Sequence, residues 1–299
     1  MDMESRSYIT HLFELVKENK LSEETINKSV RRILRVKFLL GLFDNPYAYC
    51  DIQREKNTIM SKEIQDAALK VAQESIVLLK NEKNILPLKK DIKTIAVIGP
   101  LADDKENPLG GWAAFGNPDD VLSVIDGLKN KVLNTKILYS KGCEIESDSK
   151  DGFSDAISKA KNSDVVILVL GEGRDMSGEA RNRATLNLPG VQEELVKEIY
   201  KTGKPIVVVL MNGRPLSIEW IDKNISGIIE AWFPGIKSGQ AIADVLFGDI
   251  NPSGKLPVTF PRTVGQVPIY YNHKNTGRPP SVLNPFSSKY IDVPYTPLY

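Results

Sequence analysis

Two uninterrupted apolar runs limit what this chain can fold into. Residues 165–170 read Val-Val-Ile-Leu-Val-Leu, and residues 206–211 read Ile-Val-Val-Val-Leu-Met. Short runs of this kind, without polar alternation, are typical of strands that are buried on both faces. Helical patterns lie between these runs and the other strand candidates. The sequence therefore predicts an α/β fold in which helices cover both faces of a mostly parallel sheet.

Strands and helices are expected to alternate through most of the chain. Strands are predicted at residues 95–98, 135–139, 165–170, 206–211 and 225–230, with a further candidate at 258–260. Helices are predicted at residues 7–18, 23–40, 61–81, 121–130, 153–161, 191–202 and 237–247. Tight turns with Gly or Pro follow several strands, so we expect these turns to line one rim of the sheet.

Changes in composition divide the chain into four expected segments. Residues 1–45 carry two amphipathic helices, which cannot make a domain alone because each exposes an apolar face. Residues 46–60 are polar and rich in turn signals, which indicates a linker. Residues 61–262 hold the sandwich. Residues 263–299 are rich in proline, which predicts an extended arm that needs another surface to lie on.

Composition excludes several functional classes. The 299 residues include 39 Lys and Arg against 38 Asp and Glu, and a net charge of +1 attracts neither nucleic acid nor an anionic membrane. No apolar run is as long as a membrane span. The chain has two cysteines and two histidines, which are too few to predict a disulfide framework, a His-based triad or a multi-histidine metal site. We expect no metal and no cofactor, so carboxylates must carry any acid–base chemistry.

Two glutamates, seven residues apart, follow the first apolar run within the stretch Leu170-Gly171-Glu172-Gly173-Arg174-Asp175-Met176-Ser177-Gly178-Glu179. Ligands of open α/β sheets collect at the carboxyl ends of the strands, and a Gly-rich loop there can bring a proton donor to a substrate. Glu179 is our candidate general acid, and Glu172 is the runner-up. The alternative for Glu179 is a charge on a solvated loop. The alternative for Glu172 is an orienting hydrogen bond.

Arginines and one tryptophan complete the candidate site. A guanidinium that points at an acid favours its charged form, so at least some of Arg174, Arg181 and Arg183 must face elsewhere or bind sugar hydroxyls. Trp112 lies on a glycine-flanked loop, where an exposed indole could stack against a sugar ring. A packing role in the core is the alternative for Trp112.

The motifs together resemble glycoside hydrolase family 3, the β-glucosidase-like enzymes, over essentially the whole chain. The matching stretches include Leu40-Gly41-Leu42-Phe43-Asp44, Glu74-Ser75-Ile76-Val77-Leu78, Gly111-Trp112, Ser177-Gly178-Glu179 with Arg183, Asn212-Gly213-Arg214-Pro215-Leu216 and Ala231-Trp232-Phe233-Pro234-Gly235. The resemblance implies a six-stranded α/β sandwich preceded by the last helices of a truncated (β/α)8-type barrel. It also implies an extended C-terminal arm that leads toward an absent third domain.

By the same resemblance, the chain carries the acid/base half of a retaining exo-β-glycosidase, most simply a β-glucosidase. Glu179 would be the acid/base, with Trp112 and Arg183 in contact with substrate. The aspartate nucleophile would lie on a missing N-terminal barrel portion, so we expect the isolated fragment to be inactive. Expected substrates are β-linked oligosaccharides and aryl or alkyl glucosides. The sequence does not decide whether the protein forms a homo-oligomer. Two alternative functions also remain: a non-catalytic carbohydrate-binding or interaction module, and a nucleotide-binding domain.

Overall fold

Contacts divide the chain into two units, one that ends at Ser61 and one from Lys62 to Tyr299. The computed structural model describes residues 3–274, 277–281, 283–284, 286–287 and 289–299, so parts of the predicted first segment and of the predicted arm lie outside the described residues. None of the helices in these ranges is long and apolar enough to cross a bilayer.

Residues 3–61 of the first unit contain three helices, α1 (Ser7–Lys17), α2 (Glu23–Leu39) and α3 (Ile52–Thr58). The Ser22 side chain accepts a hydrogen bond from the backbone N of Thr25, and so begins α2 as predicted. The Asp51 side chain caps α3 in the same way. Helix α3 lies inside the stretch that we predicted as a linker, where its short length and polar sequence hide any apolar periodicity.

The second unit is built around a six-stranded sheet with the strand order β1-β6-β5-β4-β2-β3. Strand β1 is antiparallel to β6, and the other neighbours are parallel. The strands are β1 (Val77–Asn81), β2 (Thr94–Ile98), β3 (Lys136–Ser140), β4 (Val165–Gly171), β5 (Ile206–Met211) and β6 (Gly227–Glu230). The helices are α4 (Lys62–Ser75), α5 (Val124–Lys131), α6 (Phe153–Lys161), α7 (Gln192–Tyr200), α8 (Glu219–Asn224) and α9 (Ser238–Leu246).

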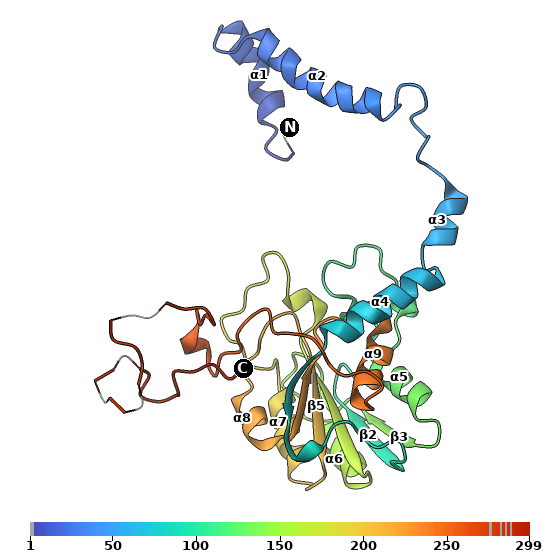
Figure 1. Ribbon diagram of the computed structural model, residues 1–299, viewed down its shortest axis with the longest axis vertical. Helices are drawn as coiled ribbons and strands as arrows, with labels where there is room; N and C mark the ends of the chain where they lie inside the picture. Colours follow the sequence, from blue (N-terminus) through green and yellow to red (C-terminus); the bar gives the residue numbers. More distant parts are fainter. Residues whose placement is uncertain (1–2, 275–276, 282, 285, 288) are drawn as a thin grey trace. The chain divides into compact units, whose positions relative to one another are not determined.

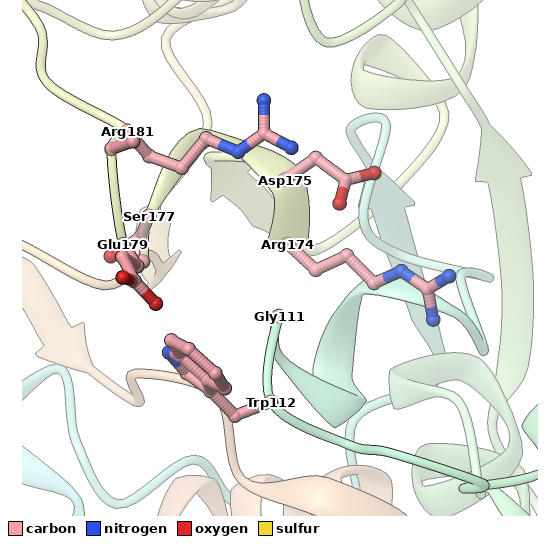
Figure 2. A pocket seen from close by; sticks show the side chains of 9 residues that line it. Gly111, Trp112, Arg174, Asp175, Ser177, Glu179 and Arg181 are labelled. Carbon is pink, nitrogen blue, oxygen red and sulfur yellow. The ribbon is translucent and has the colours of Figure 1, made fainter. Parts of the chain in front are cut away.

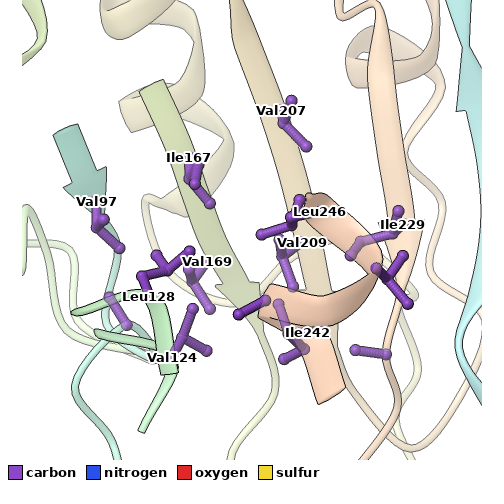
Figure 3. Close-up of a cluster of buried hydrophobic side chains, with 14 of the residues drawn as sticks. Val97, Val124, Leu128, Ile167, Val169, Val207, Val209, Ile229, Ile242 and Leu246 are labelled. Carbon is purple, nitrogen blue, oxygen red and sulfur yellow. The ribbon is translucent and has the colours of Figure 1, made fainter. Parts of the chain in front are cut away.

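Alternate residues of β4 face opposite layers of helices, which confirms the predicted α/β sandwich (Figure 1). Ile167 and Val169 join the cluster that includes residues of α4, α5 and α9, part of which is drawn in Figure 3. Val166 and Leu168 join the cluster on the other face, with residues of α6, α7 and α8. Every residue of β4 and β5 is buried, which explains why both runs are apolar without alternation.

The sixth strand of the sheet is β1, and the observed set of strands corrects two predictions. The helix that we predicted over residues 61–81 ends at Ser75, and residues 77–81 instead pair with β6, from Val77 opposite Glu230 to Asn81 opposite Gly227. The candidate strand at 258–260 is not a strand of the sheet. Apolar spacing cannot distinguish a continued helix from a short strand, because the strand is stabilised by a partner far along the chain.

The C-terminal segment returns to the sandwich. The backbone N of Phe260 donates to the carbonyl of Tyr299 (3.0 Å), and the N of Leu298 donates to the carbonyl of Phe260 (2.8 Å). Leu298 and Tyr299 pack against the cluster on the α6–α8 side of the sheet. The surface that the predicted arm required is therefore supplied, at its end, by this same unit.

A truncation at the centre of the sheet should show how much stability the sandwich layer provides. Leu168 is fully buried, so Leu168→Ala should lower the free energy of unfolding by about 2–5 kcal/mol. Leu133→Ala is the matched control, because this leucine is 84% exposed and its loss should change stability by less than about 0.5 kcal/mol. Denaturant unfolding of both variants provides the measurement, and equal effects would contradict the burial pattern.

Candidate functional site

Two loops at the carboxyl edge of the sheet form a pocket of about 380 Å³. One loop follows β4, and the other follows β2 and carries Trp112. The lining residues are Gly111, Trp112, Arg174, Asp175, Ser177, Gly178, Glu179, Ala180 and Arg181. The structure thus brings together Glu179 and Trp112, the two residues that we chose from the sequence as the proton donor and the sugar platform.

The Glu179 side chain is exposed and points toward the Trp112 indole in Figure 2. Trp112 is 74% exposed, so the indole is not a core residue. Gly178 has a φ of +147°, and a Cβ built there would lie 3.5 Å from Nε1 of Trp112. The backbone beside Glu179 therefore runs close to the indole in a conformation that favours glycine.

No arginine of the loop that follows β4 forms an ion pair with Glu179. Arg174 pairs with Glu106 (2.8 Å) and points away from Glu179 in Figure 2. Arg183 pairs with Glu172 (2.7 Å). Within the described ranges, Glu179 has no ion pair shorter than 4 Å. Its carboxyl group remains free to meet a ligand.

Asn107 connects the two loops. Its Oδ1 accepts a hydrogen bond from the backbone N of Arg174 (2.7 Å), and its Nδ2 donates to Asp104 (2.6 Å). The ion pair between Arg174 and Glu106 adds a second link between the loops. The Trp112 loop and the Glu179 loop are therefore fixed to each other at Arg174.

Glu172, the runner-up acid, lies outside this pocket. Its side chain has no solvent exposure and its carboxylate contacts two guanidinium groups, those of Arg183 and Arg214. This geometry favours the orienting alternative that we gave for Glu172. Arg183, which we expected to bind substrate, donates to Glu172 and to the carbonyl of Asn187 (2.9 Å). Its guanidinium is occupied within the protein.

A second buried carboxyl, Glu230, lies at the end of β6. Its oxygens accept hydrogen bonds from the backbone N of Trp232 and from Nδ2 of Asn212, each 2.9 Å long. Burial raises the pKa of Glu230 well above its ordinary value, although these two hydrogen bonds act in the opposite direction. Burial therefore disfavours the charged form of Glu230, and its two hydrogen bonds order the turns after β5 and β6.

Sequence reasoning assigned no role to Arg214, Asn212 or Glu230. Asn212 and Arg214 belong to the turn Asn212-Gly213-Arg214-Pro215 after an apolar run, which we predicted on the rim of the sheet without a function. In the part of the chain that the structure describes, no three His, Cys, Asp or Glu side chains come together as metal ligands.

A family model described as the glycosyl hydrolase family 3 C-terminal domain matches residues 76–295, well over half of the chain. The chain belongs to this family. The periplasmic β-glucosidase of Salmonella typhimurium is 41% identical over 325 aligned positions, which cover 100% of this chain and 42% of that protein. A β-xylosidase of Formosa agariphila is 46% identical and covers 90% of this chain and 38% of that protein.

Solved structures of family 3 enzymes share the fold. The β-glucosidase of Listeria innocua in complex with glucose superposes with a TM-score of 0.91 at 38% identity, covering 100% of this chain and 41% of that chain. A mutant of the same enzyme has been solved in complex with laminaribiose, and it superposes with a TM-score of 0.92 at 39% identity, covering 100% of this chain and 41% of that chain. The chain thus spans about two fifths of the length of these relatives.

The buried Glu230 should give this family 3 chain a measurable dependence of stability on pH. Because its pKa is raised on folding, the native state holds this proton more tightly, so the associated stability is present below about pH 4.5 and is lost as the pH rises. Glu230→Gln stays neutral at every pH. Above about pH 4.5, the unfolding free energy of Glu230→Gln minus that of the native sequence should therefore rise by about 1.4 kcal/mol per pH unit. The rise should stop at the raised pKa of Glu230.

Thermal or denaturant unfolding between pH 4 and pH 8 measures this difference. Glu146→Gln serves as the control, since Glu146 is exposed and should give a flat difference across the same range. A Glu230→Gln difference that does not change with pH would contradict the raised pKa of Glu230.

Proposed function

We propose that this chain supplies the general acid/base of a retaining exo-β-glycosidase that acts on β-glucosides, and that Glu179 is this group. The observation that carries the proposal is the exposed Glu179 carboxyl, which forms no ion pair with any residue that the structure describes and lies opposite the exposed Trp112 indole in one pocket. The β-glucosidase relatives support β-glucosides as the substrate class. Neutral glucosides also match a chain with a net charge of +1.

The proposed reaction has two steps, and Glu179 acts in both. In the first step, the protonated carboxyl of Glu179 donates its proton to the glycosidic oxygen while the bond from C1 to that oxygen breaks. A carboxylate nucleophile forms a bond to C1 and completes a covalent glycosyl-enzyme. In the second step, the ionised Glu179 takes a proton from water, whose oxygen attacks C1 and releases the nucleophile. The sugar leaves with its anomeric configuration retained.

The nucleophile belongs, in this proposal, to a barrel domain outside these 299 residues. The relatives are more than twice as long as the matched region, which leaves room for such a domain. The chain alone should then fail to turn over glycosides. Trp112 would stack on the sugar or aryl group that leaves, because the indole and Glu179 face the same opening.

A chimera tests the role of Glu179. This chain would replace the matched region of the Listeria innocua β-glucosidase, and kcat/KM would be measured for an alkyl and an aryl β-glucoside. Glu179→Gln should lower kcat/KM for the alkyl glucoside about 10²- to 10⁴-fold, because an alkoxide cannot leave without a proton. The loss should be much smaller for 2,4-dinitrophenyl β-glucoside, whose phenolate leaves unassisted. Azide, which needs no general base, should accelerate turnover of the covalent intermediate in Glu179→Ala.

The matched control is Glu146→Gln, an exposed carboxylate that does not line the pocket, which should leave both rates within about twofold. Full alkyl glucosidase activity in Glu179→Gln would refute the acid/base role. A folded chimera that binds glucose but shows no turnover of any glycoside would favour the non-catalytic carbohydrate-binding module.

The platform role of Trp112 predicts a separate defect in the same chimera. Trp112→Ala should lower kcat/KM for aryl glucosides about tenfold, equivalent to about 1.4 kcal/mol of lost binding in the transition state. Phe115→Ala is the control, because Phe115 is a fully exposed aromatic residue of the same loop that does not line the pocket. Equal losses in the two variants would argue against specific stacking on Trp112.

A further inference from the structure

We infer that Arg214 is the positioning residue of the general acid, and that it acts by clamping the backbone on both sides of Glu179. Its guanidinium donates hydrogen bonds to the carbonyls of Met176 and Arg181, the latter at 2.9 Å. These carbonyls lie three residues before and two residues after Glu179. The inference rests on the proposed function of Glu179 and adds to it a residue from the turn after β5.

Glu172 holds this guanidinium in place. Nε of Arg214 lies 3.1 Å from Oε1 and 3.3 Å from Oε2 of Glu172, and Nη1 of Arg183 lies 2.7 Å from Oε1. The Glu172 side chain has no exposure, and the two arginine side chains are 18% and 16% exposed. A carboxylate buried this deeply requires such partners, and it fixes them in return.

The clamp spans the whole loop. Glu172 is the first residue after β4, and its backbone N donates to the carbonyl of Met211 at the end of β5 (2.9 Å). Arg183 extends the cluster to the far end of the loop through the carbonyl of Asn187. The beginning, the middle and the end of the loop are therefore all tied to one buried carboxylate beside β5.

Close packing against the turn after β5 supports the same role. A Cβ built on Gly213 would lie 2.2 Å from Oγ of Ser177, so the Glu179 loop rests directly on the residue that precedes Arg214. Within the described ranges, the Glu179 side chain has no hydrogen bond or ion pair of its own. Its location is therefore set by its backbone, which Arg214 holds from both directions.

The hydrogen bonds that Arg214 makes predict that lysine will not substitute for it. The guanidinium reaches two carbonyls and a carboxylate with donors in one rigid plane, whereas an ammonium is a single point with three donors. A general acid must lie within hydrogen-bond distance of the glycosidic oxygen, and a displacement of about 1 Å can cost about 10²-fold in rate. Loss of the clamp should therefore impair proton donation while the rest of the pocket stays formed.

The first measurement uses the chain itself and needs no activity. In Arg214→Lys, amide hydrogen exchange of residues 174–181 should accelerate at least tenfold, while peptides from β4 and β5 remain protected. Arg262→Lys is the matched control, since Arg262 also donates to two backbone carbonyls, those of Thr296 and Pro297, but away from the pocket. Unchanged exchange of residues 174–181 in a folded Arg214→Lys would overturn the inference. If Arg214→Lys does not fold, the same exchange measurement is made on Glu172→Gln, which removes the charge that holds Arg214 and keeps the side-chain shape. Exchange of residues 174–181 should again accelerate, and unchanged exchange would overturn the inference.

The second measurement uses the chimera and the two classes of glucoside. Arg214→Lys should lower kcat/KM about 30- to 100-fold for an alkyl β-glucoside and less than threefold for 2,4-dinitrophenyl β-glucoside. A merely structural role would lower both values equally, because it would reduce the fraction of active enzyme. Equal losses, or none, would overturn the inference.

The Glu179→Gln chimera separates this result from the proposed function. If Glu179→Gln discriminates between the two glucosides and Arg214→Lys does not, Glu179 is the acid and the positioning role of Arg214 is refuted. If Glu179→Gln lowers kcat/KM equally for the two glucosides, the proposed function is refuted. The positioning role of Arg214 is then refuted as well, because it depends on that function.

Discussion

The parallel pairing of β4 with β5 is the constraint on which the site depends. The register runs from Val166 opposite Ile206 to Gly171 opposite Met211, so both strands end at the same level. Glu172 and Arg214, which are 42 residues apart in the sequence, therefore begin their loops side by side. A slip of one strand along the other would separate the two strand ends and misplace the loops that follow them. The packing of the core thus determines the geometry of the pocket.

The two glutamates of the loop after β4 show how the environment of a carboxylate determines its role. Glu172 lies seven residues before Glu179 and is enclosed by two arginines, whereas Glu179 faces an open pocket beside an indole. Their spacing and residue type are equally compatible with catalysis, and only their partners distinguish them. The buried glutamate orders the loop, and the exposed one is available for chemistry.

The sequence was informative wherever the signal was local. The apolar runs predicted β4 and β5, and Ser22 predicted the start of α2, because burial on two faces and capping leave clear patterns. Strand β1 was missed because its partner β6 lies about 150 residues away, and helical spacing at residues 76–79 gave a competing interpretation. Trp112 and Glu179 could be selected because each lies on a Gly-rich loop after a strand. Arg214 could not, since its carboxylate and carbonyl partners belong to another loop.

The hydrogen bonds between Phe260 and the last two residues turn the C-terminal stretch into a closed loop whose two ends meet on the sandwich. The entropy lost on closing such a loop grows only with the logarithm of its length, so doubling the length would cost about 0.6 kcal/mol. The length of this loop should therefore have little effect on the stability of the sheet. Its two anchor points cannot shift in the same way, because Phe260 is fully buried and Tyr299 packs against it.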